Sequence, residues 1–146
     1  MPPTVFKPAS ADVFRIALVN IDNENDFSQK GGSLYVPGAD KAASRTANFI
    51  ETYLERITTT FSSFDKHGHR HIFYNIWWQD AQGNHPSDLT QITYDDVLHG
   101  IWIPIYDSEW SINYVRTLGS ITIWPIHCPA DGPGSEMVAV IAKAIG

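Results

Sequence analysis

Apolar residues recur along the chain with the spacings of buried strands and amphipathic helices. Residues 13–21, VFRIALVNI, form a mostly apolar run that predicts a strand buried on both faces, as in parallel sheets. Residues 57–64, ITTTFSSF, predict a second strand, because β-branched and aromatic residues favour the extended chain. Between them, apolar positions spaced by four and three residues predict one face of a helix that includes Ala43. These positions are Ala47, Ile50, Leu54 and Ile57.

The second half of the chain continues this alternation of strand and helix. Residues 108–118, SEWSINYVRTL, predict a short helix, and residues 120–126, SITIWPI, predict a third strand. Residues 137–145 predict a last helix that is apolar almost all round and therefore requires burial on more than one side. Strands that alternate with helices predict an α/β fold, with a parallel sheet of about three strands and flanking helices.

The same pattern suggests how the chain is divided. Residues 1–12 read as a loose N-terminal arm, and residues 13–146 as one domain. Residues 72–107 are aromatic, polar and irregular, which is a long stretch for a structureless loop in a compact domain. We therefore interpret them as an insert with a functional role.

Composition narrows the class of protein. A chain of 146 residues that is 43% hydrophobic has enough apolar residues for a core. A net charge of −6 argues against nucleic acid or an anionic membrane as the main partner, and no apolar run approaches the roughly 20 residues of a membrane span. One cysteine forms no internal disulfide, and the start lacks the apolar stretch of a secretory signal, so we expect a cytoplasmic protein.

Residues suited to metal binding follow the ends of the predicted strands. Asp65 and His67 follow the second strand, and His127 follows the third. The carboxyl ends of parallel strands meet at one edge of a sheet, so these side chains are expected to converge. One carboxylate and two imidazoles suit Zn²⁺ as first choice, with Fe²⁺ or Mn²⁺ as alternatives. His71 is a fourth ligand or a supporting donor; the alternative is that HGHRH is an exposed loop without metal.

Two further residues raise the question of catalysis. Asp22 ends the first strand and is either a general base or a residue that only caps the following loop. Cys128 directly follows His127, but neighbouring side chains on a strand point to opposite faces, so His127 is badly placed to act as its base. A single buried cysteine is usually inert. We therefore interpret His127 as the working residue and Cys128 as packing.

Taken together, these segments resemble the nicotinamidase group of the isochorismatase-like cysteine hydrolases. ALVNIDNENDFSQKGGSLYVPGAD is similar to the opening of that group, and SSFDKHGHRHI to its D-x-H…H-I segment. WWQDAQGNHPSDLTQITYDDVLHGIW is similar to an insert of one branch, and YVRTL with ITIWPIHC to the Y-V-x-x-L…I-W-P-x-H-C pattern. The matches run in the correct order from Arg15 to Gly134.

The resemblance implies a role for each matching residue. Asp22 corresponds to the catalytic aspartate, and Phe27 to an aromatic residue near the substrate ring. The positions that correspond to metal ligands are Asp65, His67 and His127, with His71 as a further or supporting ligand. Glu24 stands where the group usually has glutamine. The implied cofactor is a divalent metal and the implied substrate a small-molecule amide.

The family mechanism also uses a lysine and a nucleophilic cysteine that lie beyond the region matched here. Lys143 lies within an apolar helix and does not correspond to that lysine, and Cys128 corresponds to the cysteine of the W-P-x-H-C motif. The resemblance thus implies a truncated fold, to be completed by a homo-oligomer or a second protein. Two functions remain open: an amide hydrolase that converts nicotinamide to nicotinate and ammonia, or an inactive structural or interaction subunit that keeps the fold, with or without the metal. A third, weaker interpretation is a metal-binding α/β module unrelated to hydrolysis.

Overall fold

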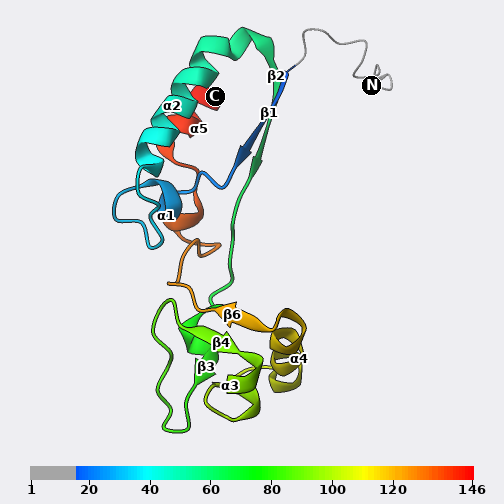
Figure 1. The fold of residues 1–146 in the computed structure, drawn as a ribbon. Coiled ribbons are helices and arrows are strands. Elements are labelled where there is room, and N and C mark those ends of the chain that lie inside the picture. The colour runs from blue at the N-terminus through cyan, green and yellow to red at the C-terminus, as the bar shows by residue number, and fades with distance from the viewer. Residues whose placement is uncertain (1–15) are drawn as a thin grey trace, which may run out of the picture.

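The computed structural model describes residues 16–146, which form two lobes joined by two chain segments (Figure 1). The predicted arm, residues 1–12, and the start of the first predicted strand, residues 13–15, lie outside the described residues. Each lobe has its own cluster of buried apolar side chains. The two segments that join the lobes run side by side, and they carry the candidate site.

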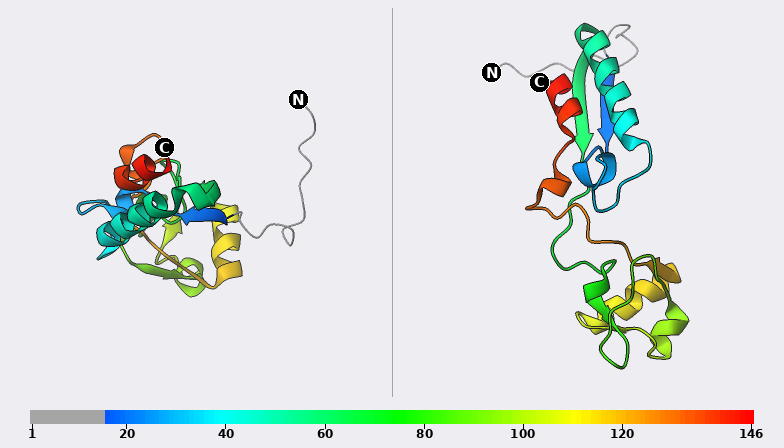
Figure 2. Two further views of the ribbon diagram at one scale, coloured as in Figure 1. Left: turned by 90° about the horizontal axis from the view of Figure 1, so that it is seen from above. Right: turned by 90° about the vertical axis from the view of Figure 1, so that its left-hand side faces the viewer.

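The first lobe is a parallel strand pair covered on one side by helices. β1 pairs with β2 in parallel, with Val19 opposite Phe61. α2 and α5 pack against each other on the same side of this pair (Figures 1 and 2). The elements of this lobe are β1 (Ile16–Ile21), α1 (Asn25–Ser28), α2 (Ala39–Tyr53), a 3₁₀ turn (Leu54–Arg56), β2 (Ile57–Ser63), a 3₁₀ turn (Pro133–Ser135) and α5 (Ala139–Ile145).

The helix predicted around Ala43 is confirmed as α2. Ala43, Ala47 and Ile50 lie on its buried face, against Ile141 and Ala144 of α5. Small residues on α2 allow the two helices to pack closely, and burial of their apolar atoms contributes about 25 cal/mol per Å². Leu54, placed on the same face by sequence, lies instead in the exposed 3₁₀ turn that ends α2.

The second lobe contains the region that the sequence marks as an irregular insert. It is not irregular, because short elements here enclose a core built around Trp78, Ile92, Val115 and Ile123. The capping box of Thr93 and Asp96 starts α3, and Gly119, with φ 82°, ends α4. The elements are a 3₁₀ turn (Asn75–Trp77), β3 (Trp78–Gln79), β4 (Gln91–Thr93), α3 (Tyr94–Leu98), β5 (Ile103–Pro104), α4 (Ser108–Leu118) and β6 (Ser120–Thr122).

The third predicted strand is shorter than expected and belongs to a different sheet. β6 pairs antiparallel with β4, and β3 pairs antiparallel with β5, so the parallel sheet of the described residues consists of β1 and β2. Gly119 turns the chain back beside β4, and Pro125 has no N–H with which to continue a ladder. The α/β class with a parallel sheet and flanking helices is nevertheless confirmed.

The prediction that the first strand is buried on both faces is wrong for the described residues. Val19 is 60% exposed and Phe61 is 59% exposed, on the face of the strand pair turned away from α2 and α5. The last helix likewise buries Ile141 and Ala144 but leaves Val140 exposed. Within residues 16–146 nothing covers these surfaces.

No helix among these residues has the length and apolarity that crossing a membrane requires.

Candidate metal centre

The three predicted ligands lie where the two joining segments meet. Asp65 and His67 come from the segment after β2, and His127 from the segment after β6. The N–H of His67 donates to the carbonyl of Cys128 at 2.9 Å, and the N–H of Ala130 donates to the carbonyl of His67 at 2.9 Å. This parallel bridge fixes the two segments in register, so ligands that are 60 residues apart in sequence become neighbours.

The carboxylate of Asp65 lies between the two imidazoles. Its Oδ1 is 2.9 Å from Nε2 of His67, and its Oδ2 is 3.3 Å from Nε2 of His127. One ligand atom from each of the three residues lies within 4.8 Å of the others. His127 is buried, whereas Asp65 and His67 are partly exposed. The expected convergence of these side chains is confirmed, although His127 follows β6, which is not a strand of the parallel sheet that was expected to bring them together.

The environment of His127 fits a metal ligand. Its Nδ1 is 2.6 Å from the carbonyl oxygen of Pro125. A neutral imidazole that donates its Nδ1–H there keeps a free electron pair on Nε2, which a metal ion can accept. Metal-binding histidines commonly donate their other N–H to a carbonyl in this way, which fixes the tautomer. Tyr74 donates its hydroxyl to the carbonyl of His127 at 2.6 Å, so the backbone of the ligand is held as well.

The spacing and the donor set both fit a divalent metal. Ligands about 2.1 Å from a tetrahedral ion lie about 3.4 Å from each other, close to the separations around Asp65. Two imidazole nitrogens and one carboxylate oxygen are donors that Zn²⁺ accepts, with a fourth position left for water or substrate. Asp65, His67 and His127 would hold such an ion.

His71 lies beside this group and outside it. Its ring centroid is 4.5 Å from that of His67, and its Nδ1 accepts the N–H of Phe73 at 3.4 Å. Burial, and then the neighbouring His67, lowers the pKa of His71. Its expected role as a fourth or supporting ligand stays a prediction.

Asp22 and Phe27 occupy the first lobe near the same edge of the strand pair. Asp22 is exposed, has φ 51° and accepts the hydroxyl of Ser63 at 3.0 Å. The ring of Phe27, in α1, is 5.6 Å from that of His127, so an aromatic surface adjoins the metal ligands. The catalytic role of Asp22 and the substrate contact of Phe27 remain predictions.

Cys128 has the properties of a packed thiol. The side chain is fully buried, and its Sγ lies 3.8 Å from the carbonyl oxygen of Gly134. Burial, and then the carboxylates of Glu24 and Asp26, raises the pKa of the thiol to about 12. The thiolate that nucleophilic catalysis needs is therefore scarce at neutral pH.

Sequence reasoning overlooked two buried carboxylates, Glu24 and Asp26. Glu24 accepts the N–H of Asp65, and Asp26 accepts the N–H of Cys128. Burial raises the pKa of Glu24, opposed by the hydrogen bond from Asp65. A signal for them is present in the sequence: Asp22, Glu24 and Asp26 occupy every second position directly after an apolar run.

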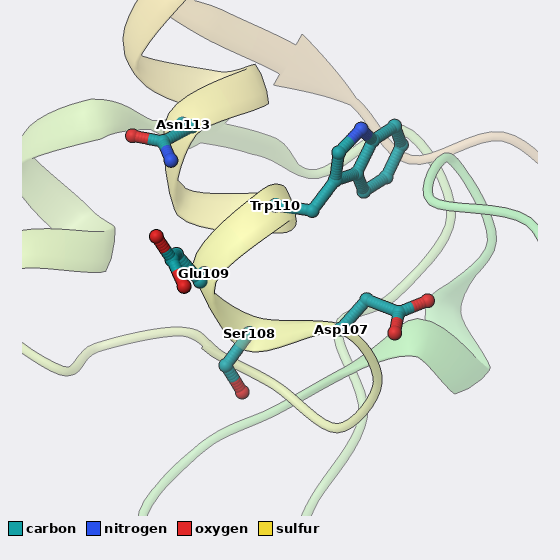
Figure 3. Close-up of a pocket in the computed structure, with 5 residues that line it drawn as sticks. All are labelled: Asp107, Ser108, Glu109, Trp110 and Asn113. Atoms are coloured by element: carbon teal, nitrogen blue, oxygen red, sulfur yellow. The ribbon is translucent and has the colours of Figure 1, made fainter.

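A hollow of the second lobe lies away from these residues. It has a volume of about 470 Å³ at the start of α4 and is lined by Trp110 and four polar residues (Figure 3). None of the residues around Asp65 lines it. The polar residues are Asp107, Ser108, Glu109 and Asn113. This hollow is therefore separate from the candidate metal centre.

Comparison with known proteins identifies the fold. No family model and no curated protein matches the sequence. The solved structure of the yeast nicotinamidase Pnc1p matches 90% of this chain with a TM-score of 0.59 and 21% identity. The same enzyme bound to the inhibitor nicotinaldehyde matches with a TM-score of 0.59 and 19% identity. The chain covers 51% of each solved chain, so it spans about half their length. Over the portion that it matches, the chain has the isochorismatase-like fold of the nicotinamidase group.

Proposed function

We propose that this chain provides the metal centre and the aspartate of a nicotinamidase-like amide hydrolase, which converts an amide such as nicotinamide to its acid and ammonia. The observation that carries the proposal is the meeting of Asp65, His67 and His127 on a nicotinamidase fold. The yeast enzyme Pnc1p is a nicotinamidase by name, and its structure with nicotinaldehyde contains a pyridine-ring inhibitor.

The residues of this chain would bind and orient the substrate. Asp65, His67 and His127 would hold a divalent metal, with Zn²⁺ the first choice. When bound, the metal supplies a Lewis acid suited to a pyridine nitrogen. Phe27, 5.6 Å from the ring of His127, offers an apolar face against which a flat ring packs.

Asp22 would move the proton in this scheme. A thiol from outside residues 1–146 attacks the amide carbon, and Asp22 accepts the thiol proton as the S–C bond forms. The proton passes to the departing nitrogen as the C–N bond breaks, and ammonia leaves. Water then hydrolyses the thioester to the acid and regenerates the thiol. Asp22 is exposed at the end of β1, where an incoming group can reach it.

The attacking thiol, and the lysine that the family resemblance adds to it, must come from a completing polypeptide segment. A second copy of residues 1–146 brings no residue that the first copy lacks, and Cys128 is buried with a pKa of about 12. Further strands would pack on the exposed Val19 and Phe61 face and along the edge of β1 that no strand of residues 16–146 pairs with. That segment would form one sheet with β1 and β2.

The buried state of Cys128 also favours a second candidate, an inactive subunit that keeps the fold and the metal. The two candidates differ in one measurement: ammonia release from nicotinamide, with added Zn²⁺, Fe²⁺ or Mn²⁺, when residues 1–146 are combined with a completing segment that carries the lysine and the thiol. Only the hydrolase candidate predicts release. We expect no turnover from this polypeptide by itself. Turnover that persists in Cys128→Ala and disappears in Asp22→Ala would reveal another nucleophile within the chain and contradict this account.

Elemental analysis tests the metal centre itself. Wild-type protein is expected to retain one equivalent of metal after dialysis, and His127→Ala to retain none. His69→Ala is the matched control, because His69 is exposed and pairs with Asp131 rather than with Asp65. Equal metal content in wild type and His127→Ala would contradict a metal centre at these residues.

A further inference from the structure

Two carboxylates reach from the start of α1 to the segments that carry the metal ligands. Glu24 is fully buried and Asp26 is 8% exposed, so both have left water. A buried carboxylate is costly unless hydrogen bonds to N–H groups replace its hydration. The hydrogen-bond partners of these two carboxylates therefore indicate which parts of the chain the carboxylates hold in place.

Glu24 is joined to the first ligand segment. Its Oε1 accepts the backbone N–H of Asp65, the residue that lies between the two imidazoles. The other oxygen, Oε2, is buried and has no hydrogen-bond partner among the described residues. Glu24 thus acts on Asp65 through one oxygen.

Asp26 is joined to the second ligand segment. Its Oδ2 accepts the N–H of Cys128, the residue after His127, at 2.7 Å. Its Oδ1 accepts the N–H of Ser33 at 3.1 Å, so both oxygens have partners. Cys128 has φ 45°, a strained conformation for a residue with a side chain, and the hydrogen bond from its N–H helps to hold it.

Gly134 makes room for this arrangement. A Cβ on Gly134 would overlap both oxygens of Asp26. The carboxylate thus occupies the space that any larger residue at position 134 would need. Substitution at Gly134 must therefore shift Asp26, although Gly134 does not itself belong to the metal group.

We propose that Glu24 and Asp26 are positioning residues of the metal centre, each fixing one ligand segment through a backbone N–H. The inference rests on the metal centre of the proposed function. Glu24 sets the place of Asp65, and Asp26 sets that of His127 through Cys128. Outer hydrogen bonds that orient metal ligands typically change metal affinity 10- to 100-fold when they are removed.

The different use of their oxygens predicts different responses to amide substitution. Glu24→Gln keeps the one acceptor oxygen that Asp65 needs, so Zn²⁺ affinity stays within about twofold of wild type. Asp26→Asn keeps one acceptor oxygen for the two N–H groups of Ser33 and Cys128. Its NH₂ group would then face one of these two donors. It is expected to weaken Zn²⁺ binding about 10-fold or more. If the two residues served only the stability of the fold, Glu24→Gln and Asp26→Asn would not differ in Zn²⁺ affinity.

The experiment measures Zn²⁺ affinity of the full chain by competition with a chelator, together with the visible absorption of bound Co²⁺. Glu24→Ala and Gly134→Ala are expected to lose about 10- to 100-fold in affinity and to alter the Co²⁺ spectrum. Ile141→Val is the control, because it destabilises the α2–α5 core without touching the ligand segments. Circular dichroism establishes that each variant is folded.

The outcomes separate this inference from the proposed function. Tight Zn²⁺ binding by wild type, retained in Glu24→Gln and Ile141→Val and weakened in Asp26→Asn and Gly134→Ala, supports the proposal. Wild-type affinity in both Asp26→Asn and Gly134→Ala overturns it and leaves the metal centre intact. If wild type binds no Zn²⁺, the metal centre fails and this inference fails with it. Should Glu24→Ala not fold, the Glu24→Gln and Asp26→Asn contrast still decides.

Discussion

Tyr74 donates its hydroxyl to the carbonyl oxygen of His127 across 2.6 Å, although the two residues are 53 positions apart. Tyr74 is almost completely buried and belongs to the second lobe, whereas His127 belongs to the joining segment that continues to α5. One hydrogen bond thus links the insert to a predicted metal ligand. The insert therefore contacts the candidate metal centre directly.

Removal of this hydroxyl is expected to lower both stability and metal affinity. Tyr74→Phe leaves a buried carbonyl without its partner, which costs about 1–3 kcal/mol of unfolding free energy. Urea denaturation measures that change. Tyr114→Phe is the control, since the Tyr114 hydroxyl has no hydrogen-bond partner among the described residues. Equal stability of the two variants would show that the Tyr74 bond contributes nothing.

Metal binding is expected to stabilise the folded chain. The three ligands are brought together only in the native state, so Zn²⁺ at 100 times its dissociation constant adds about 2.7 kcal/mol to the unfolding free energy. Thermal melts with and without Zn²⁺ measure the effect, and a chelator should reverse it. The same addition should leave the melting of His127→Ala unchanged; an equal shift there would point to binding elsewhere.

Cys128 is expected to resist thiol reagents and to make stability fall at high pH. Its pKa is raised from an ordinary 9.0 to about 12, so the folded state favours the protonated thiol. The stability from this difference is fully present below pH 9 and is lost as pH rises from 9 toward 12. Alkylation by iodoacetamide at pH 8 should be slow in native protein and rapid in urea. Rapid labelling of native protein would contradict the burial.

The capping box of α3 gives a prediction in the second lobe. The side chain of Thr93 accepts the N–H of Asp96, and Asp96 accepts the N–H and the hydroxyl of Thr93. Thr93→Ala is expected to cost about 0.5–2 kcal/mol in urea denaturation. The hydroxyl and then the N–H of Thr93 lower the pKa of Asp96. The stability that ionised Asp96 contributes is therefore present above its ordinary pKa of 3.8 and is lost as pH falls through its lower pKa in the folded state. A Thr93→Ala variant as stable as wild type would disprove the role of the cap.

The exposed face of the β1–β2 pair is expected to cause association of the isolated chain. Val19 and Phe61 lie opposite each other on that face, beside the edge of β1 that has no partner strand within the described part of the chain. Light scattering during size exclusion at micromolar concentration should give a mass above 16.3 kDa, and Val19→Lys with Phe61→Lys should reduce it. Leu89→Lys, on the exposed surface of the second lobe, is the control. A monodisperse wild-type monomer would contradict this expectation.

The sequence predicts the ligands of the site better than their support. Asp65, His67 and His127 follow apolar runs that the sequence shows, although a backbone bridge between the joining segments, and not a shared parallel sheet, brings His127 to Asp65 and His67. Glu24 and Asp26 act on backbone N–H groups of residues 41 and 102 positions away. A backbone acceptor imposes no residue type on its partner, so this pairing leaves no pattern to find in one sequence.

Helices and the parallel pair are predictable for a similar reason. The spacing of Ala43, Ala47 and Ile50 reflects burial on one side, and α2 follows from it. The antiparallel pairing of β6 with β4 depends on the turn at Gly119 and on contacts made inside the insert. Such contacts are tertiary, and short apolar runs do not reveal which strand they will pair with.

Two separate apolar cores, joined by two chain segments, have a consequence for cooperativity. Side chains in one core do not pack against those in the other, so heat can melt one lobe while the other remains native. An ion held between the joining segments would tie the two melting events into a single transition. Calorimetry would then show two overlapping endotherms in a chelator and one sharper endotherm with Zn²⁺.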